Sequence, residues 1–355
     1  MSRRGIPKWL GNGDSGAGSR KGARNRYYAG PPSDHFDGTV FFNPGGRPPG
    51  KVGDLLRWRF RETRAKWPAS FPSPFPPAKP ETRVDGDTLR VTMVGHATLL
   101  VQVAGVNILT DPVWSERCSP LTFAGPRRVS APGIAFADLP RIDLVLLSHN
   151  HYDHLDTATL RRLREAHDPQ VITPLGNDTI VRAAVPRMRV SAHDWSESVG
   201  FGPLTVHLEP VHHWSARGAG DRRMALWAGF VVETPAGRIY HVGDTGFHDG
   251  ANYRAARAKY GGFRLAILPF GAYEPRWLMA PQHQDPAEAV EGMLLANAAY
   301  VAGHHWATFQ LTNEPIEEPR EKLYEALDVK GISRDRFRPM LPGEVWDVPT
   351  EPSSA

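Results

Sequence analysis

The nine residues SHNHYDHLD at positions 148–156 constrain this chain more than any other part of its sequence. They follow the run 142–147, which is apolar except for Asp143 and is typical of a strand buried on both faces. Four potential metal ligands therefore lie directly after a central strand: His149, His151, Asp153 and His154. Imidazole and carboxylate groups of this kind suit zinc, and also manganese or iron. This density favours a metal site over a histidine-rich surface loop.

Four residues are too few to hold two ions, so further ligands are expected from later strand ends. Strand-like segments at 204–208, 238–242 and 300–302 each lead to a candidate: His213, Asp244 and His305. His212 adjoins His213, and His304 adjoins His305. The positions by themselves leave both choices of histidine open.

The remaining pattern is one of many strands with interspersed helices. Polar clusters recur at the carboxyl ends of the strands, where a rigid sheet usually carries functional loops. Further strands are expected at 89–94, 98–103, 106–110, 171–174, 190–192, 225–233 and 265–269. Helices are expected at 157–166, after the N-cap candidate Asp156, and at 285–296, opened by Asp285 and Pro286.

The basic charge of the chain is concentrated at its beginning. Residues 1–30 carry seven Lys or Arg and one Asp, whereas the other 325 residues carry 35 bases and 37 acids. Because this segment is rich in Gly, Ser and Arg without periodicity, we expect a disordered arm over residues 1–32. Such an arm can touch anionic lipid, and we expect no nucleic-acid partner. A solvated tail without a partner is the simpler interpretation.

Residues 33–85 are expected to form an N-terminal extension before a hydrolase domain over 86–350. A helix is predicted within 51–67, with one face formed by Leu56, Phe60, Thr63 and Trp67. Packing on the body is favoured over lying on a membrane surface, which stays open. Six prolines between 68 and 80 then predict a stiff, extended connector.

The composition also limits the setting in which the chain acts. No run approaches the roughly 18 apolar residues of a spanning helix, and no apolar stretch follows Arg3 and Arg4. Cys118 is the sole cysteine, so no internal disulfide can form. We therefore expect a cytoplasmic protein, with peripheral association at the membrane surface left open. The sequence also leaves a homodimer open.

The order HxHxDH, His, Asp and His over residues 88–310 resembles the metallo-β-lactamase superfamily. This resemblance implies an α/β fold, a four-layer αββα sandwich with a dinuclear site at one edge. It implies that His149, His151 and His213 hold one ion. It implies that Asp153, His154 and His305 hold the other and that Asp244 bridges the two. His213 and His305 are preferred to their neighbours because each directly precedes a Trp in the family pattern.

A narrower resemblance is to the N-acylphosphatidylethanolamine-hydrolysing phospholipase D branch. It rests on SHNHYDHLD, HHWSAR, GDTGF, GAYEPRWLM, QHQDPAEAV, HHWATF, and on SDHFDG followed by FFNP. This resemblance implies that Gln282 and His283 lie beside the metals and that Asp111 orients a ligand histidine. Tyr273 and Trp277, in GAYEPRWLM, are expected to bind substrate. Of the chemical roles, we assign Asp244 and His283 to catalysis; for His283, a residue at a helix start without a chemical role is the alternative.

The expected activity is hydrolysis of N-acylphosphatidylethanolamine, a phospholipid, to an N-acylethanolamine and phosphatidic acid. Two Zn²⁺ ions are expected, with Mn²⁺ or Fe also compatible; such a pair lowers the pKa of a shared water. Other metallo-hydrolase substrates stay open, including sugar-phosphate lactones, other lactones and nucleotide diesters. A di-iron redox protein or a non-catalytic metal-binding module is a more distant alternative. Four tryptophans could line an acyl groove or lie in the core: Trp195, Trp214, Trp277 and Trp306.

Overall fold

The computed structural model describes residues 24–350. Within this range the strands form two seven-stranded sheets, with the orders β14–β1–β2–β3–β4–β5–β6 and β13–β12–β11–β10–β9–β8–β7. The strands of the first sheet are β1 (Leu89–Gly95), β2 (Thr98–Val103), β3 (Val106–Thr110), β4 (Leu144–Leu146), β5 (Gln170–Pro174), β6 (Arg189–His193) and β14 (Val345–Asp347). Those of the second are β7 (Ser198–Phe201), β8 (Leu204–Glu209), β9 (Gly229–Thr234), β10 (Gly237–His241), β11 (Phe263–Pro269), β12 (Ala298–His304) and β13 (Phe337–Pro339).

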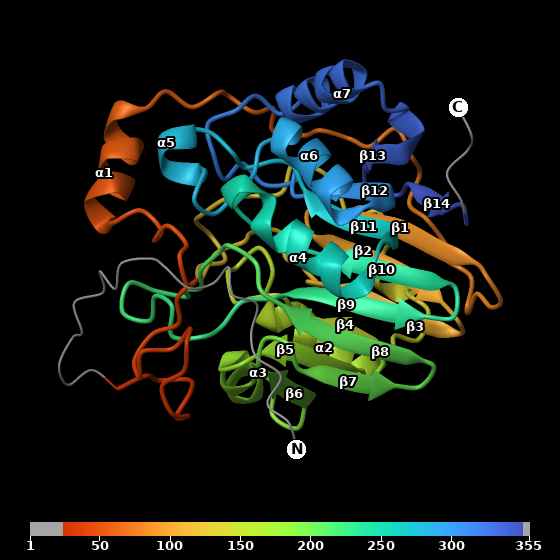
Figure 1. Cartoon of the computed structure of the whole chain (residues 1–355), viewed down its shortest axis with the longest axis horizontal. Helices are drawn as coiled ribbons and strands as arrows, with labels where there is room; N and C mark the ends of the chain where they lie inside the picture. The colour runs from red at the N-terminus through yellow and green to blue at the C-terminus, as the bar shows by residue number, and fades with distance from the viewer. Residues whose placement is uncertain (1–23, 351–355) are drawn as a thin grey trace.

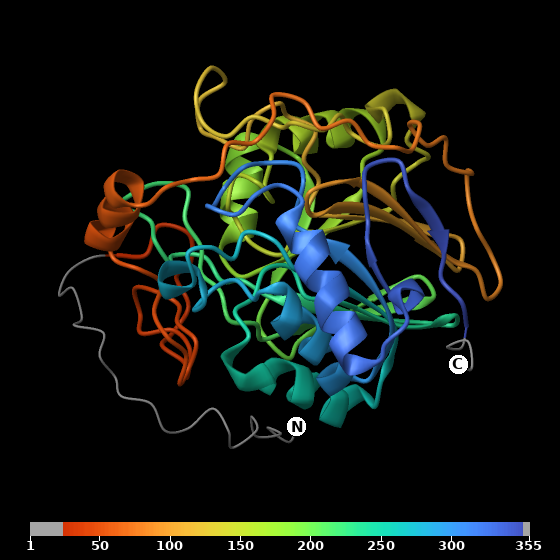
Figure 2. The same ribbon diagram turned by 90° about the horizontal axis from the view of Figure 1, so that it is seen from above.

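Helices lie on the outer faces of the two sheets and at one end of the sandwich (Figure 1). They are α1 (Val52–Arg61), α2 (Thr157–Ala166), α3 (Asn177–Ala184), α4 (Ala251–Tyr260), α5 (Arg276–Met279), α6 (Pro286–Ala296) and α7 (Glu318–Lys330). Figure 2 shows α2 and α3 (yellow-green) on one side of the molecule and α4 (teal) on the other. The predicted four-layer αββα sandwich is therefore confirmed.

Alternation along β4 shows how the layers are packed together. Leu144 and Leu146 belong to the core between the two sheets, whereas Val145 and Leu147 belong to the core beneath α2 and α3. Successive residues of a strand point to opposite faces, so a strand covered on both sides must be apolar throughout. This is the physical reason for the apolar residues 144–147, of which the first three form the strand.

The two predicted helix starts are confirmed. The Asp156 side chain accepts hydrogen bonds from the backbone N–H groups of Ala158 and Thr159, and α2 begins at Thr157. Asp285 caps α6 in the same way and forms a capping box with Glu288. The strand predicted over 225–233 is wrong in its first part. Residues 225–228 are apolar because they are buried, but they precede the strand, which begins at Gly229.

The predicted arm lies for the most part outside the described residues, but residues 24–32 differ from that prediction. The Asn25 side chain is buried and donates to the backbone oxygens of Thr39 and Met224 at 2.8 and 2.9 Å. The Tyr27 hydroxyl donates to Asp221 at 2.7 Å. Tyr28 packs against the rings of Phe36 and Phe41. These contacts with distant parts of the chain order residues 24–32, and composition alone does not reveal them.

The segment between residues 45 and 88 contains one helix in the structure. The helix predicted within 51–67 ends at Arg61, and no helix or strand follows until Leu89, as the prolines predict. Leu56 and Phe60, expected on a packed face, are 54% and 79% exposed. Among residues 24–350, no helix has both the length and the apolar composition needed to cross a membrane.

Candidate metal centre

Strand topology brings the predicted ligands to one edge of the sandwich. β3 and β4 run parallel in the first sheet, and β10, β11 and β12 run parallel in the second. The carboxyl ends of parallel neighbours meet at the same sheet edge. Residues 148–156 follow β4, Asp244 follows β10, and His305 follows β12. His213 lies four residues beyond β8.

Three histidines form the first group of this cluster. Nδ1 of His151 lies 2.9 Å from Nε2 of His149 and 3.2 Å from Nε2 of His213. Each of these atoms could serve as one ligand of a shared cation. The structure places His213 here, while the neighbouring His212 stacks on His248 with ring centroids 4.1 Å apart. The geometry thus brings His213, and not His212, to the cluster.

Asp153, His154 and His305 form the second group, and Asp244 lies between the two groups. Oδ2 of Asp153 lies 3.6 Å from Nε2 of His154 and 3.3 Å from Nε2 of His305. Oδ2 of Asp244 lies 3.1 Å from each of the same two nitrogens. It also lies 3.9 Å from Nε2 of His149 and 3.7 Å from Nε2 of His213. One carboxylate therefore reaches both groups.

These distances fit a metal ion in the second group. Ligand atoms at the usual zinc–nitrogen and zinc–oxygen distances are about 3.3 Å apart in a tetrahedron. The four nitrogen–oxygen distances among Asp153, His154, His305 and Asp244 lie between 3.1 and 3.6 Å. Oδ1 of Asp244 is buried without a hydrogen-bond partner. A cation would satisfy these polar groups together.

The protonation states also suit metal binding. Burial, together with the neighbouring histidines, holds the pKa of His149 well below its ordinary value. Burial likewise lowers the pKa of His151 to about 3 and that of His213 to about 4, so these lone pairs are free at neutral pH. Burial opposes protonation of His305, but the carboxylates of Asp244 and Asp153 outweigh it and raise its pKa to about 9. In the second group a metal ion would replace protons held between imidazoles and carboxylates.

Outer contacts orient three of the histidines. Asp111, which follows β3, faces Nδ1 of His154 at 2.9 Å through Oδ2 and accepts from the Ser148 hydroxyl. The Ser148 hydroxyl in turn lies 2.9 Å from Nδ1 of His149. The backbone oxygen of Gln282 accepts from Nδ1 of His213 at 3.0 Å. Each contact leaves the other ring nitrogen, Nε2, facing the cluster, which is the usual arrangement of a metal-ligating histidine.

His283 borders both groups. Its ring centroid lies 5.2 Å from that of His213 and 5.2 Å from that of His305. Burial holds the pKa of His283 well below its ordinary value, so the imidazole is neutral at neutral pH. Gln282, its neighbour, contributes through its backbone oxygen, because its side-chain nitrogen contacts the Met279 sulfur instead.

The two residues expected to bind substrate lie in different settings. Tyr273 is buried, and its hydroxyl donates to Glu318 of α7 at 2.7 Å, away from the histidine groups. Trp277, on α5, is 43% exposed and donates to Glu62 next to α1 at 3.0 Å. Of the other tryptophans, Trp195 and Trp306 are core residues. Trp214 is half-buried, and its ring lies 4.6 Å from that of His151.

The structure adds His96, which sequence reasoning missed. Its Nε2 lies 3.0 Å from Oδ2 of Asp153, and it forms a potential metal-binding group with Asp153, His154 and His305. The available signal was a histidine in the short GHAT connection between two predicted strands, where Gly or Asn is usual.

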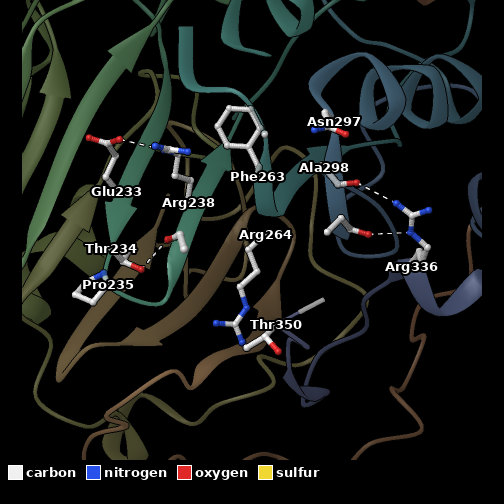
Figure 3. A pocket seen from close by; sticks show the side chains of 13 residues that line it. Glu233, Thr234, Pro235, Arg238, Phe263, Arg264, Asn297, Ala298, Arg336 and Thr350 are labelled. Atoms are coloured by element: carbon white, nitrogen blue, oxygen red, sulfur yellow. Dashed lines mark hydrogen bonds and ion pairs between the residues drawn. The ribbon is translucent and has the colours of Figure 1, made fainter. Parts of the chain in front are cut away.

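A cavity of about 650 Å³ lies at the opposite ends of the strands (Figure 3). It is lined by the first residues of β10, β11 and β12, including Arg264, and by Arg336. Arg264 donates to the backbone oxygen of Ala236, and Arg336 to that of Ala299. These arginines bind carbonyl groups of the chain, and the cavity holds none of the clustered histidines. The cluster at the carboxyl ends is therefore the candidate active site.

Comparison with known proteins identifies the domain. Residues 106–306 match the family model described as the β-lactamase superfamily domain. The chain is similar to N-acyl-phosphatidylethanolamine-hydrolyzing phospholipase D 1 of Caenorhabditis elegans, with 36% identity over 336 residues, 88% of this chain and 93% of that protein.

More distant relatives agree. The mitochondrial N-acyl-phosphatidylethanolamine-hydrolyzing phospholipase D of Saccharomyces cerevisiae is 32% identical over 69% of this chain and 53% of its own length. Among solved structures, the isothiocyanate hydrolase from Delia radicum gut bacteria superposes with a TM-score of 0.58. It covers 72% of this chain and 98% of that chain at 23% identity, which supports the fold alone.

Proposed function

This chain belongs to the N-acyl-phosphatidylethanolamine-hydrolyzing phospholipase D family of the β-lactamase superfamily, and we propose that it hydrolyses N-acylphosphatidylethanolamine. The protein is a metal-dependent hydrolase with the metallo-β-lactamase fold. In the proposed reaction, a water oxygen forms a bond to phosphorus and the bond from phosphorus to the ethanolamine oxygen breaks. That oxygen takes one proton, and the products are an N-acylethanolamine and phosphatidic acid.

The observation that carries the proposal is the position of Asp244 between two ligand groups. We assign His149, His151 and His213 to one ion, and the second group, Asp153, His154 and His305, to the other. Oδ2 of Asp244 lies within 3.9 Å of a nitrogen in each group, which supports its role as the shared ligand. The mixture of imidazole and carboxylate favours two Zn²⁺ ions.

Two such ions, when bound, supply an activated water and neutralise the anionic oxygens of a phosphodiester. The remaining chemistry falls to the protein. Asp111 and Ser148 hold His154 and His149 in orientation. His283 is the candidate for bracing a phosphoryl oxygen or protonating the leaving oxygen. The first role suits a neutral, buried imidazole better, because it requires only an N–H donor.

We also propose that the lipid approaches from the side of α1 and α5. Figure 1 shows these helices side by side, and Arg57 of α1 stacks on the Trp277 ring of α5 at 4.7 Å. Leu56 and Phe60 of α1 are exposed, and Arg59 and Arg61 flank them. Apolar side chains among basic residues suit the interface of an anionic lipid layer. The chain from α5 leads directly to His283.

The decisive experiment measures products from a dispersed lipid. Zinc-loaded protein is incubated with N-acylphosphatidylethanolamine in water enriched in ¹⁸O, and the masses of both products are measured by mass spectrometry. We expect N-acylethanolamine without label and phosphatidic acid with one ¹⁸O, because water attacks phosphorus. Phosphatidylethanolamine and phosphatidylcholine serve as substrates without the N-acyl group. No turnover of the N-acyl lipid by metal-replete protein would overturn the proposal, as would much faster cleavage of a lactone or cyclic nucleotide.

A further inference from the structure

His96 occupies a turn position that its residue type does not favour. β1 and β2 pair antiparallel with Gly95 opposite Thr98, so only His96 and Ala97 connect the two strands. His96 has φ +56°, in the left-handed region where glycine or asparagine is usual. Non-glycine residues with strained backbone cluster at active sites and ligand-binding sites. Glycine would adopt the backbone conformation of this turn with less strain.

The backbone and the imidazole of His96 both contact the second ligand group. Its backbone oxygen accepts from the N–H of His305 at 3.0 Å, and its own N–H donates to the Thr308 hydroxyl at 2.9 Å. Its Nε2 lies 3.0 Å from Oδ2 of Asp153, and its ring centroid lies 4.1 Å from that of His305. The side chain is 1% exposed, so water does not compete for this contact.

We propose that His96 is a positioning residue for one metal ion, holding Asp153 through its imidazole and His305 through its backbone. Nε2 of His96 makes a hydrogen bond to Asp153, whereas Nε2 of His154 and Nε2 of His305 have no hydrogen-bond partner and are left for a metal. Because an ionised carboxylate only accepts hydrogen bonds, Nε2 of His96 carries the proton in this contact and offers no lone pair to a metal. Asp153, His154, His305 and Asp244 already supply four potential ligand atoms, with nitrogen–oxygen distances of 3.1–3.6 Å among them. His96 therefore acts on the ligands and not as one of them. This inference rests on the two-ion assignment proposed above.

The test compares three substitutions at this position in the full chain. His96→Gly removes the imidazole and suits φ +56°. His96→Asn also tolerates this backbone, but its shorter amide does not reach Asp153. His96→Gln places an amide nitrogen about where Nε2 lies. Each protein is stripped with a chelator and equilibrated with a series of free Zn²⁺ concentrations. Bound zinc is then counted by mass spectrometry, and thermal unfolding of the stripped proteins reports on folding.

We expect two zinc ions in the unsubstituted protein and in His96→Gln. In His96→Gly and His96→Asn one ion stays tightly bound, and affinity for the other falls by about 10–100-fold, the usual effect of losing an outer contact to a ligand. Two tightly bound ions in the folded Gly and Asn variants would overturn the inference. A Gln variant as weak as the Gly variant would overturn it too. An unsubstituted protein that binds fewer than two ions would instead overturn the two-ion assignment. Because zinc is counted without substrate, these results do not depend on which lipid is cleaved.

Discussion

Asp244 is the residue on which the two ligand groups converge. Its carboxylate is buried, and only imidazole nitrogens lie within ion-pair distance of it among residues 24–350. Burial would raise the pKa of Asp244, but the His154 and His305 imidazoles outweigh this and hold the pKa well below its ordinary value. The carboxylate is thus ionised at neutral pH and available to two cations at once.

Replacing this carboxylate should affect both ions. We expect Asp244→Ala to lose metal and to show only background turnover, because each group loses an anionic ligand. Metal content by mass spectrometry and lipid turnover by product release measure the two effects. Asp244→Asn keeps the side-chain volume without the charge and should show the same loss. If Asp244→Ala retains two bound metals, the bridging role is contradicted.

His283 is expected to act on the substrate and not on the metals. His283→Ala should keep both ions and lower kcat by roughly 10²–10³-fold, the range seen when one oxyanion donor is removed. Steady-state kinetics and metal analysis of the same preparation separate the two effects. His283→Gln restores an N–H donor and should recover part of the rate. Unchanged turnover in the Ala variant would assign His283 to the start of α6 without a chemical role.

At the residue scale, the sequence predicted the residues of the cluster better than it predicted the residues that contact them. HxHxDH after an apolar strand marks a ligand run because local spacing alone brings those side chains together. The choice of His305 over His304 depends on backbone geometry: His305 has φ +69° and turns its ring to the cluster, while His304 lies by His241. His96 meets Asp153 across 57 positions of the chain, and no local pattern encodes such a contact.

At the scale of elements, predictions succeeded where a local physical signal exists. β4 is indicated by the apolar residues 144–147, and α2 is indicated by an N-cap aspartate. β14 is a three-residue edge strand, and the strand with which it pairs, β1, lies far away in the sequence. α7 was not predicted either. Only Pro319, Leu323 and Leu327 of its thirteen residues are buried, so its apolar stripe is narrow.

α1 is the element on which the proposed lipid approach depends. Burying a large apolar side chain contributes about 1.5–3 kcal/mol. Leu56→Asp combined with Phe60→Asp should therefore lower binding to vesicles of anionic phospholipid by at least about tenfold, measured by co-sedimentation. Zinc content should be unchanged, because neither side chain belongs to the metal groups. Val329→Asp, at an 85% exposed apolar position on α7, is the matched control and should bind as the unsubstituted protein does. Equal binding by all three proteins would contradict an α1 surface for lipid.

At the scale of the whole molecule, the N-terminal extension is built into the catalytic body. Phe36 and Phe41 are buried in the main hydrophobic core, to which both sheets contribute. The Asn43 side chain donates to the backbone oxygen of Val211 at 2.7 Å and so braces the segment that leads to His213. The predicted boundary at residues 85 and 86 separates motifs in the sequence, whereas packing joins the segments on either side of it. We infer that the extension supports the position of the first ligand group.

His35 makes this attachment sensitive to pH. Its Nδ1 lies 2.6 Å from Asp34 and its Nε2 lies 2.8 Å from Asp194, and its ring stacks on Trp195. Burial lowers the pKa of His35, but the hydrogen bonds and charges of Asp194 and Asp34 outweigh it, so the net pKa is raised. A raised pKa in the folded state means that this stabilisation is complete below the unfolded pKa of about 6.5. It is lost as pH rises through the higher folded value.

His35→Gln should therefore cost more stability in mild acid than in base. Charge-assisted hydrogen bonds contribute more than neutral ones, so we expect the loss in unfolding free energy to be on the order of 1 kcal/mol greater at pH 5.5 than at pH 8.5. Urea unfolding across this pH range, with circular dichroism as the probe, measures it. His167→Gln is the control of opposite sign. Burial lowers the pKa of His167, so its contribution is present above the unfolded pKa and lost as pH falls toward the folded value. A stability loss in His35→Gln that is the same at every pH would show that His35 joins the extension to the body as a neutral ring, which can donate to only one of the two carboxylates.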